Sequence, residues 1–506
     1  MRIKNQESRI KNSQGAMGAR GLASAHLRPS VHLCSLIAVL ALSVAPATAQ
    51  GPDRSHPPAT GPAPSLTLPD VAKRTLSNGL PVWVVEQHEV PLVQVNLIVR
   101  AGSATDPDGK FGVGSLTAAM LDEGAGGRSS LELADAVDFL GADLGTSSSY
   151  DYSAVRLSVP VARLDQALPL MADVVLRPSF PDDELERLRA ERLTSFIQAR
   201  DNPAALAQIA FPRIVYGARH RYGTIASGTP ASVEGLGAAD LRRFYTTHYR
   251  PDTSAIIVVG DTTAAAVLPM LERAFGGWTA DGPAPATAPL PAAPPDQPRH
   301  IYIVDKPGAA QSQIRIGWVG VPRQTPDYPT LQVLNTILGG SFTSRLNTNL
   351  REEHGYAYGA FSAFDTRLAA GPFFAQAGVQ TDKTAESLHE FFVELEGIRK
   401  PIPADELEKA KNYVALGFPG EFETTGDLAR KLEEQLVYGL ADDYFETFVG
   451  AIQRVTAADV ERAAARYVRP DRFAVVVVGD RSVIEPGIKA LGLGPITVVP
   501  VDDLFK

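Results

Sequence analysis

An internal repeat constrains this chain of 506 residues more than any other feature. Residues 238–261 recur as residues 457–480, with 12 of the 24 positions identical and no gap. A shorter match, 215–217 with 437–439, keeps nearly the same offset. Because chance does not produce an ordered set of matches of this kind, the sequence predicts two tandem copies of one domain.

A stretch rich in proline and alanine, residues 282–298, separates the two copies. Proline fixes φ and removes a backbone donor, so this stretch is expected to be an extended, semi-rigid linker. We therefore place the first domain at residues 65–281 and the second at residues 299–506.

Both copies begin with β-branched apolar runs, continue with alternating helical and strand patterns, and end with a helix, an Arg-Pro-Asp turn and a strand. The predicted strands include 81–85, 93–99 and 255–259 in the first copy and 301–304, 314–319 and 473–478 in the second. This order predicts an α+β fold in which each domain is a mostly antiparallel sheet with helices packed on one face.

The first 49 residues have the features of a secretory signal. Basic residues precede an apolar run at 33–45, and small residues follow it up to Ala49, after which we predict cleavage. The run is shorter than the roughly 20 residues that span a bilayer. We therefore expect an exported, periplasmic protein with no membrane span and a flexible segment at 50–64. The sequence leaves open whether translation starts at Met1 or Met17.

Composition excludes several classes of function. The chain has 48 Lys and Arg against 57 Asp and Glu and contains no long basic block, which argues against nucleic-acid binding. The single cysteine, Cys34, excludes an intramolecular disulfide framework and a zinc site built from several thiolates. A serine hydrolase is disfavoured as well, because no Gly-x-Ser-x-Gly sequence occurs.

Several short motifs occur in a fixed order along the first copy. They are Leu76-Ser77-Asn78-Gly79-Leu80, Val99-Arg100-Ala101-Gly102-Ser103, Phe111-Gly112-Val113-Gly114, Arg250-Pro251-Asp252 and Val259-Gly260-Asp261. Together with the duplication, the set resembles the pitrilysin/insulinase family of zinc peptidases, in its mitochondrial processing peptidase-like branch. The resemblance implies two tandem homologous domains over nearly the whole mature chain.

The resemblance also shows what is missing. The family's catalytic helix carries His-x-x-Glu-His, in which two imidazoles bind zinc and the Glu acts on the metal-bound water. Here the corresponding positions hold Ser115, Ala118 and Ala119, and Ser195 stands at the position of the third ligand, a Glu in the family. None of these side chains can replace the lost groups, so we predict no metal on this chain.

A displaced metal site has little support in the sequence. Asp122 and Glu123 lie just beyond the degenerate motif, and we interpret them as a solvated helix end. No two histidines of the mature chain are four residues apart, since they stand at His56, His88, His220, His248, His300, His354 and His389.

The second copy keeps a different part of the family's machinery. Gly339 and Gly340 match its glycine-rich segment, and Arg351 and Tyr358 match its Arg…Gly-x-Ala-Tyr motif. The resemblance implies that all four contribute to substrate binding. The residues alone also allow a purely structural interpretation. Arg351 would then lie at an ordinary helix end, Tyr358 would be an ordinary strand residue, and the glycines would form a helix C-cap. Gly355 is expected to end the helix that carries Arg351, so that Tyr358 starts the next strand.

An Arg/Tyr half without a zinc half implies the non-catalytic subunit of an exported heterodimeric zinc metallopeptidase that acts on peptides or unfolded protein segments. Zinc is then expected in a homologous partner subunit that carries His-x-x-Glu-His, and the chain alone is expected to be inactive. The alternative is a peptidase-like scaffold or assembly subunit with no role in proteolysis. A third possibility is self-sufficient hydrolysis at an unrecognised metal site. The sequence does not specify the substrate, the cleavage preference or homodimerisation.

Overall fold

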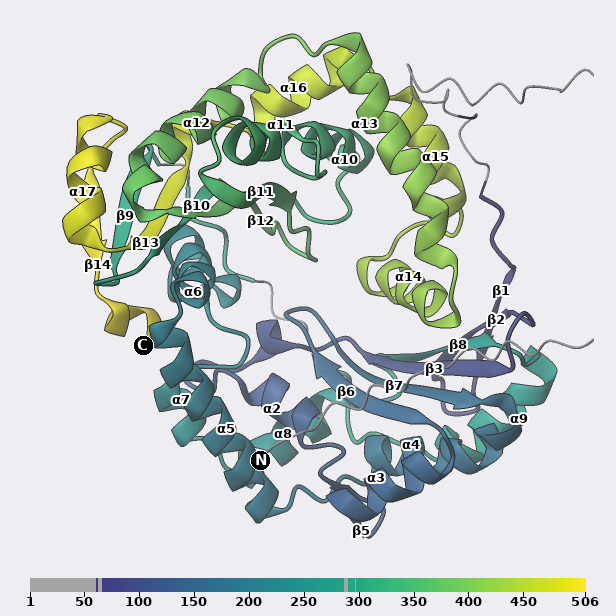
Figure 1. The fold of residues 1–506 in the computed structure, drawn as a ribbon. Coiled ribbons are helices and arrows are strands. Elements are labelled where there is room, and N and C mark those ends of the chain that lie inside the picture. The colour runs from purple at the N-terminus through teal and green to yellow at the C-terminus, as the bar shows by residue number, and fades with distance from the viewer. Residues whose placement is uncertain (1–60, 62–65, 286–289, 296) are drawn as a thin grey trace, which may run out of the picture. The chain divides into compact units, whose positions relative to one another are not determined.

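Two six-stranded sheets, each with its own helices, form the framework of the protein (Figure 1). The structure is a computed structural model and describes residues 61, 66–285, 290–295 and 297–506. The predicted signal segment and its cleavage point lie outside the described residues, as does most of the predicted segment 50–64. The described residues from 66 onward belong to one compact unit.

The first sheet has the strand order β1-β2-β8-β3-β7-β6. All neighbouring strands are antiparallel except the parallel pair β2 and β8. Its strands are β1 (Val71–Thr75), β2 (Pro81–Glu86), β3 (Leu92–Val99), β6 (Asp143–Ser148), β7 (Ser153–Pro160) and β8 (Ser254–Gly260). A small ribbon of β4 (Gly124–Ala125) and β5 (Arg128–Ser129) lies apart from this sheet.

The second sheet has the order β11-β12-β10-β13-β9-β14 and is parallel only between β13, β9 and β14. Its strands are β9 (His300–Asp305), β10 (Gln311–Val319), β11 (Ala357–Phe364), β12 (Pro372–Gln380), β13 (Ala474–Gly479) and β14 (Ile496–Val499). The second sheet contains the consecutive strands β9, β13, β10, β12 and β11. They correspond in this order to β2, β8, β3, β7 and β6 of the first sheet. The predicted α+β fold with two mostly antiparallel sheets is confirmed.

The helices of the first half are α2 (Val113–Ala119), α3 (Ser130–Phe139), α4 (Leu164–Leu176), α5 (Asp182–Asp201), α6 (Pro203–Tyr216), α7 (Pro230–Glu234), α8 (Ala238–His248) and α9 (Ala264–Phe275). Those of the second half are α10 (Tyr328–Leu338), α11 (Arg345–Asn347), the π-helical segment η4 (Thr348–Glu353), α12 (Thr384–Gly397), α13 (Ala404–Gly417), α14 (Thr425–Tyr438), α15 (Tyr444–Arg454), α16 (Ala457–Tyr467) and α17 (Arg481–Ala490). In the part of the chain that the structure describes, no helix combines the length and the apolar character of a membrane span.

Short 3₁₀ turns connect several of these elements. They are η1 (Ser103–Thr105), η2 (Val161–Arg163), η3 (Arg221–Gly223), η5 (Thr381–Lys383), η6 (Phe418–Phe422), η7 (Pro470–Arg472) and η8 (Val501–Phe505).

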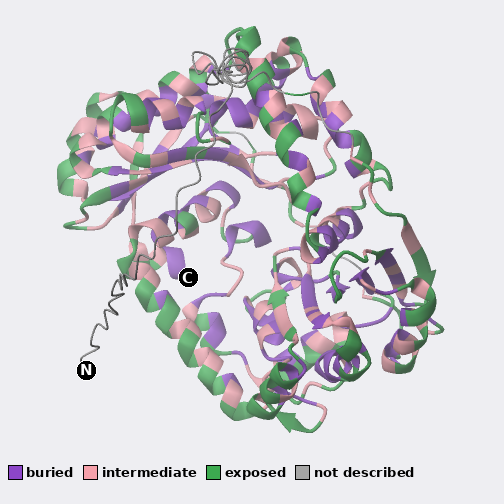
Figure 2. Cartoon of the chain, turned by 45° about the vertical axis from the view of Figure 1, so that its right-hand side comes forward, coloured by how far each residue is buried: buried purple, intermediate pink, exposed green. Residues whose placement is uncertain are grey.

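Both faces of β8 and β13 are buried, and Figure 2 shows how buried residues gather in the sheets. In β8, Ile256 and Val258 pack into a core formed by the first half's own helices, among them Leu241 of α8 and Leu271 of α9. The alternate residue Ile257 faces a second, larger core. Period-two alternation therefore supplies apolar side chains to two layers, because neighbouring side chains of a strand point to opposite faces.

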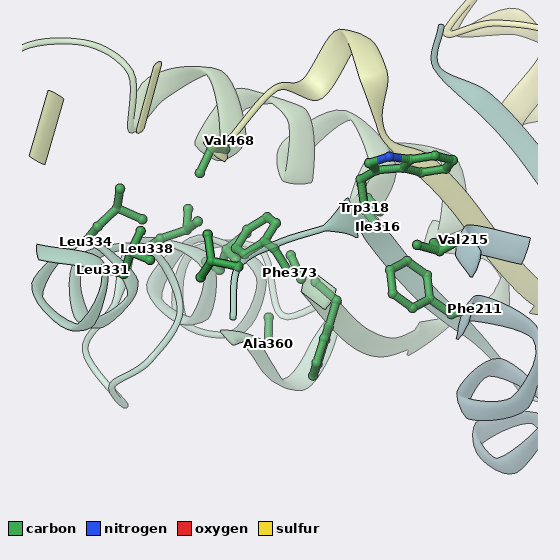
Figure 3. Close-up of a cluster of buried hydrophobic side chains, with 14 of the residues drawn as sticks. Phe211, Val215, Ile316, Trp318, Leu331, Leu334, Leu338, Ala360, Phe373 and Val468 are labelled. Atoms are coloured by element: carbon green, nitrogen blue, oxygen red, sulfur yellow. The ribbon is translucent and has the colours of Figure 1, made fainter. Parts of the chain in front are cut away.

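The second face of each sheet is covered in part by a helix from the other half, which the sequence analysis did not predict. Helix α6 of the first half packs on β10 and β13, and α14 of the second half packs on β3 and β8. These helices contain the repeated motifs 215–217 and 437–439 at their C-terminal ends. In the shared core, Phe211 and Val215 of α6 lie with side chains of the second half (Figure 3).

Candidate functional site

The glycine-rich segment forms a tight turn at the end of α10. Gly339 is the C-cap of that helix, and the backbone N–H groups of Gly339 and Gly340 donate to the carbonyl of Asn335 at 2.8 and 2.6 Å. A Cβ at Gly339 would lie 2.3 Å from the backbone nitrogen of Ser362 in β11. Glycine is therefore required here because the chain passes close to β11.

Asn347 fixes the next part of the site. Its Oδ1 accepts from the backbone N–H of Ala360 in β11 at 3.1 Å, and its Nδ2 donates to the carbonyl of Phe342 at 2.6 Å. The side chain is buried and joins the loop after Gly340 to the strand that carries Tyr358. Asn347 was not among the predicted site residues. The sequence indicates it only by its place a few residues after the glycine-rich segment.

Arg351 lies in η4, a π-helical turn of a kind that occurs frequently at functional sites. Its guanidinium lies over the rings of Phe342 and Tyr358, with distances of 4.6 and 5.0 Å to the ring centroids. Its Nε is 3.1 Å from Oε1 of Glu352, which is half exposed and therefore a weak partner. As predicted, Gly355 follows this segment, with φ of +65°.

Tyr358 is the second residue of the edge strand β11, and 87% of its surface is exposed. Gly339, Gly340, Arg351 and Tyr358 all line one open cavity of about 610 Å³. The structure thus brings together the four residues that the sequence analysis singled out for substrate binding. The neighbouring walls are polar, with Gln311 and Gln313 of β10, and aromatic, with Phe342 and Phe361.

The degenerate motif lies in the first half, on the short helix α2. Asp106 holds the start of this helix, because its carboxylate accepts from the backbone N–H groups of Gly112 and Gly114 at 2.6 and 2.9 Å. Ser115 follows and donates from Oγ to the carbonyl of Ala226 at 3.0 Å. Ala118, three residues on, is buried.

A guanidinium reaches Ser115 from α5. Nη1 of Arg192 donates to Oγ of Ser115 at 2.9 Å and lies 3.3 Å from the carbonyls of Gly112 and Ser227. Burial lowers the pKa of Arg192 to about 10. Ser195 is exposed and donates to the carbonyl of Glu191 in its own helix at 3.0 Å. The residue of α5 that contacts the motif is therefore Arg192, one turn before the predicted position.

These residues do not fit a zinc ion. Zinc in proteins takes imidazole, thiolate or carboxylate ligands, whereas Ser115, Ala118 and Ala119 supply a hydroxyl and two methyl groups. The guanidinium of Arg192 adds a positive charge at the same place. Within the described ranges, no group of three or more His, Cys, Asp or Glu side chains is placed to hold a metal ion.

The two carboxylates after the motif differ from the predicted solvated helix end. Asp122 is half-buried, and burial raises its pKa to about 6, although a hydrogen bond from Thr146 opposes the shift. Glu123, also half-buried, accepts from Nη2 of Arg187 at 2.5 Å and from Oγ of Ser130 at 2.8 Å. Tertiary contacts with α5 and α3 bury this region, and neither contact is visible in the local sequence.

Two models of one peptidase family match the chain. The model described as "Insulinase (Peptidase family M16)" matches residues 82–219, and the model described as "Peptidase M16 inactive domain" matches residues 235–414. The chain belongs to the M16 family, the pitrilysin/insulinase family that its motifs resemble. It is a peptidase-like member without the residues of the zinc motif.

Similar proteins include one named as a zinc protease and one named as a non-peptidase homolog. "Uncharacterized zinc protease YmxG" of Bacillus subtilis is 23% identical over 416 residues, which cover 81% of this chain and 98% of that protein. "Non-peptidase homolog YmxG" of Helicobacter pylori is 20% identical over 391 residues, which cover 75% of this chain and 87% of that protein.

Solved structures share the fold. A structure described as the peptidase M16 inactive domain from Pseudomonas fluorescens is 29% identical, with a TM-score of 0.76, and the match covers 81% of this chain and 98% of that one. A chain of complex III from Candida albicans is 16% identical with a TM-score of 0.69, over 83% of this chain and 99% of that chain. The latter similarity shows the fold alone.

Proposed function

We propose that this chain is the non-catalytic, Arg/Tyr-bearing subunit of an exported heterodimeric zinc metallopeptidase acting on peptides or unfolded protein segments. The observation that carries the proposal is the shared cavity of Arg351, Tyr358, Gly339 and Gly340. Its counterpart is the contact of Arg192 with Ser115, where the family's metal-binding residues are missing. Both observations support a site that is divided between this chain and a partner subunit.

Arg351 and Tyr358 can stabilise the carbonyl group of a peptide bond during hydrolysis. A guanidinium and a phenolic hydroxyl both donate hydrogen bonds, and the carbonyl oxygen of a peptide gains negative charge when water adds to its carbon. In the described structure, the Tyr358 hydroxyl has no hydrogen-bond partner, so it is free to donate to a substrate. The partner subunit would supply zinc and His-x-x-Glu-His, and this chain would bind and orient the carbonyl.

The geometry of the sheet favours an extended substrate. Among the described residues, β11 is an edge strand that pairs with β12 alone, and Tyr358 lies near its start. An unpaired strand edge binds an extended peptide through backbone hydrogen bonds, while side chains enter neighbouring pockets. Unfolded segments and peptides meet this requirement, because their backbone groups are not already paired.

Coexpression tests the proposal. The chain is produced from residue 50 onward with and without a homologue that carries His-x-x-Glu-His, encoded in the same genome, and each preparation is assayed on a quenched fluorescent peptide library. We expect a stable complex by pull-down and chelator-sensitive cleavage only by the mixture. A partner that is fully active alone contradicts the assigned role.

A second candidate is a peptidase-like scaffold in a larger assembly. The observation in its favour is the fold shared with a chain of complex III from Candida albicans. Under this alternative, Arg351 and Tyr358 have no role in turnover. A purified assembly that contains this chain, together with a genome without any His-x-x-Glu-His homologue, would support it.

A further inference from the structure

A second cavity, of about 340 Å³, lies beside the Arg351 cavity on the same face of the second sheet. Phe361 of β11 lines both cavities. Gln313 of β10 lines the first cavity and Arg315, two residues further, lines the second. Residues two apart on a strand point to the same face and are about 7 Å apart, so the second cavity begins one pleat beyond the first.

Arg315 is a half-buried cation without a counter-charge of its own. Its guanidinium carbon is 3.8 Å from the ring centroid of Phe374 in β12 and 5.2 Å from that of Phe211 in α6. Its Nε is buried and has no hydrogen-bond partner. Burial lowers the pKa of Arg315 to about 10, although the charge of Asp365 opposes the shift. Among the described residues, none forms an ion pair with Arg315.

A second guanidinium lines the same cavity. Nη2 of Arg367 donates to Oδ2 of Asp365 at 2.5 Å, while its Nη1 is buried without a partner. The guanidinium carbon is 4.1 Å from the ring centroid of Tyr150. The cavity therefore contains two guanidinium groups and one carboxylate, and both guanidinium groups retain unused buried donors. Gln208 and Gln376 are its other polar side chains.

We propose that this cavity, with Arg315 and Arg367 as its donors, binds a carboxylate of a peptide. A carboxylate has two acceptor oxygens and one negative charge, which match the unused N–H donors and the excess positive charge. The cavity is too small for more than a side chain or a chain terminus. An acidic side chain, Asp or Glu, and the C-terminal carboxylate are the two sources of this group.

The consequence for substrates rests on the proposed function. A peptide whose carbonyl lies at Arg351 and Tyr358 would place a carboxylate from a nearby position at Arg315, because the two cavities adjoin at Phe361. The heterodimer would then prefer peptides with an acidic residue a few positions from the cleaved bond. Binding of the carboxylate itself requires no partner subunit and no cleavage.

The test measures binding to the isolated mature chain. Three dansyl-labelled peptides of otherwise identical neutral sequence are compared by fluorescence anisotropy: one with a central Glu and an amidated C-terminus, one with Gln and an amidated C-terminus, and one with Gln and a free C-terminus. We expect a carboxylate-containing peptide to bind about tenfold more tightly than the neutral one, as is typical of a charge-assisted hydrogen bond. The preferred carboxylate peptide identifies the source.

Arg315→Met is the decisive variant, because its apolar chain still packs between Phe211 and Phe374 without the charge. We expect the carboxylate preference to disappear in R315M and to persist in R74M, which removes an exposed cation from β1 of the other sheet. Thermal melting verifies folding, and R315Q replaces R315M if the latter does not fold. Equal binding of all three peptides, or an unchanged preference in R315M, overturns the proposal. If the coexpressed wild-type pair shows no peptidase activity while the isolated chain keeps its preference for carboxylate peptides, only the proposed function is contradicted.

Discussion

Nη1 of Arg192 donates a hydrogen bond of 2.9 Å to Oγ of Ser115, joining α5 to the helix that carries the degenerate zinc motif. The same nitrogen lies 3.3 Å from two backbone carbonyls. The guanidinium thus supplies a hydrogen-bond donor to the Ser115 hydroxyl and to the carbonyls of Gly112 and Ser227. A guanidinium thus lies against the first position of the degenerate motif.

Restoring the motif is expected to restore zinc binding only if Arg192 changes as well. We predict that S115H/A118E/A119H with R192E binds zinc at least about tenfold more tightly than the same triple variant with S195E, because the latter keeps a cation beside the ligands. Metal content after dialysis and calorimetric titration measure the difference. Equal affinities would contradict this prediction, and tighter binding by the S195E variant would place the third-ligand position at residue 195.

Tyr358→Phe is expected to lower kcat of the reconstituted pair by about 10²-fold, with a smaller change in KM, because it removes one donor to a developing negative charge. The melting temperature should stay unchanged, since 87% of Tyr358 is exposed. Tyr302→Phe, in β9 and not among the residues that line this cavity, serves as the matched control for loss of a phenolic hydroxyl. A pair whose kcat does not respond to Y358F would leave this tyrosine without a catalytic role.

A buried polar network joins the two halves. Glu433 of α14 is 2% exposed, and its carboxylate accepts from Nδ2 of Asn96 at 2.6 Å and from Nε and Nη2 of Arg156 at 2.8 and 2.6 Å. Glu433→Ala leaves the guanidinium without its partner and should lower the free energy of unfolding by about 3 kcal/mol. Asp165→Ala breaks an exposed pair with Arg273 and should cost less than about 1 kcal/mol. Chemical denaturation compares the two, and similar losses would contradict the network's role.

The raised pKa of Asp122 predicts a pH-dependent stability. Burial raises it from 3.8 to about 6, so between these values the folded chain binds a proton that the unfolded chain has lost. The stabilisation is complete below the unfolded value and is lost as the pH rises through 6. Asp122→Asn should therefore change stability little at pH 4 and raise it by about 2 kcal/mol at pH 7. Urea denaturation at both values measures this, with Asp135→Asn on the exposed face of α3 as control. A D122N effect independent of pH would refute the assignment.

Strands were the most predictable part of the fold. The apolar runs at 81–85 and 93–99 became β2 and β3, and those at 301–304 and 314–319 became β9 and β10, each extended by one to three residues. Such runs have a local cause, because β-branched side chains favour extended backbone whatever packs on them. The packing of α6 on β10 and β13, and of α14 on β3 and β8, has no local cause, because the sheet against which a helix packs is decided by tertiary contacts.

The candidate site divides in the same way. Arg351, Tyr358 and the two glycines were identified by motif, and the loss of His-x-x-Glu-His was visible from the residue types alone. The contact of Arg192 with the degenerate motif could not be predicted from the sequence. The relative position of two packed helices depends on tertiary contacts rather than on the spacing of residues along the chain.

The amino-acid sequence by itself determined the α+β class, the family and the absence of the zinc-binding residues, because identity and order of residues carry that information directly. Only the tertiary structure decided that Arg192 lies against Ser115 and that Arg315 and Arg367 line one cavity. These residues are distant in sequence, and the free energy that brings them together comes from burial of two sheets and their exchanged helices.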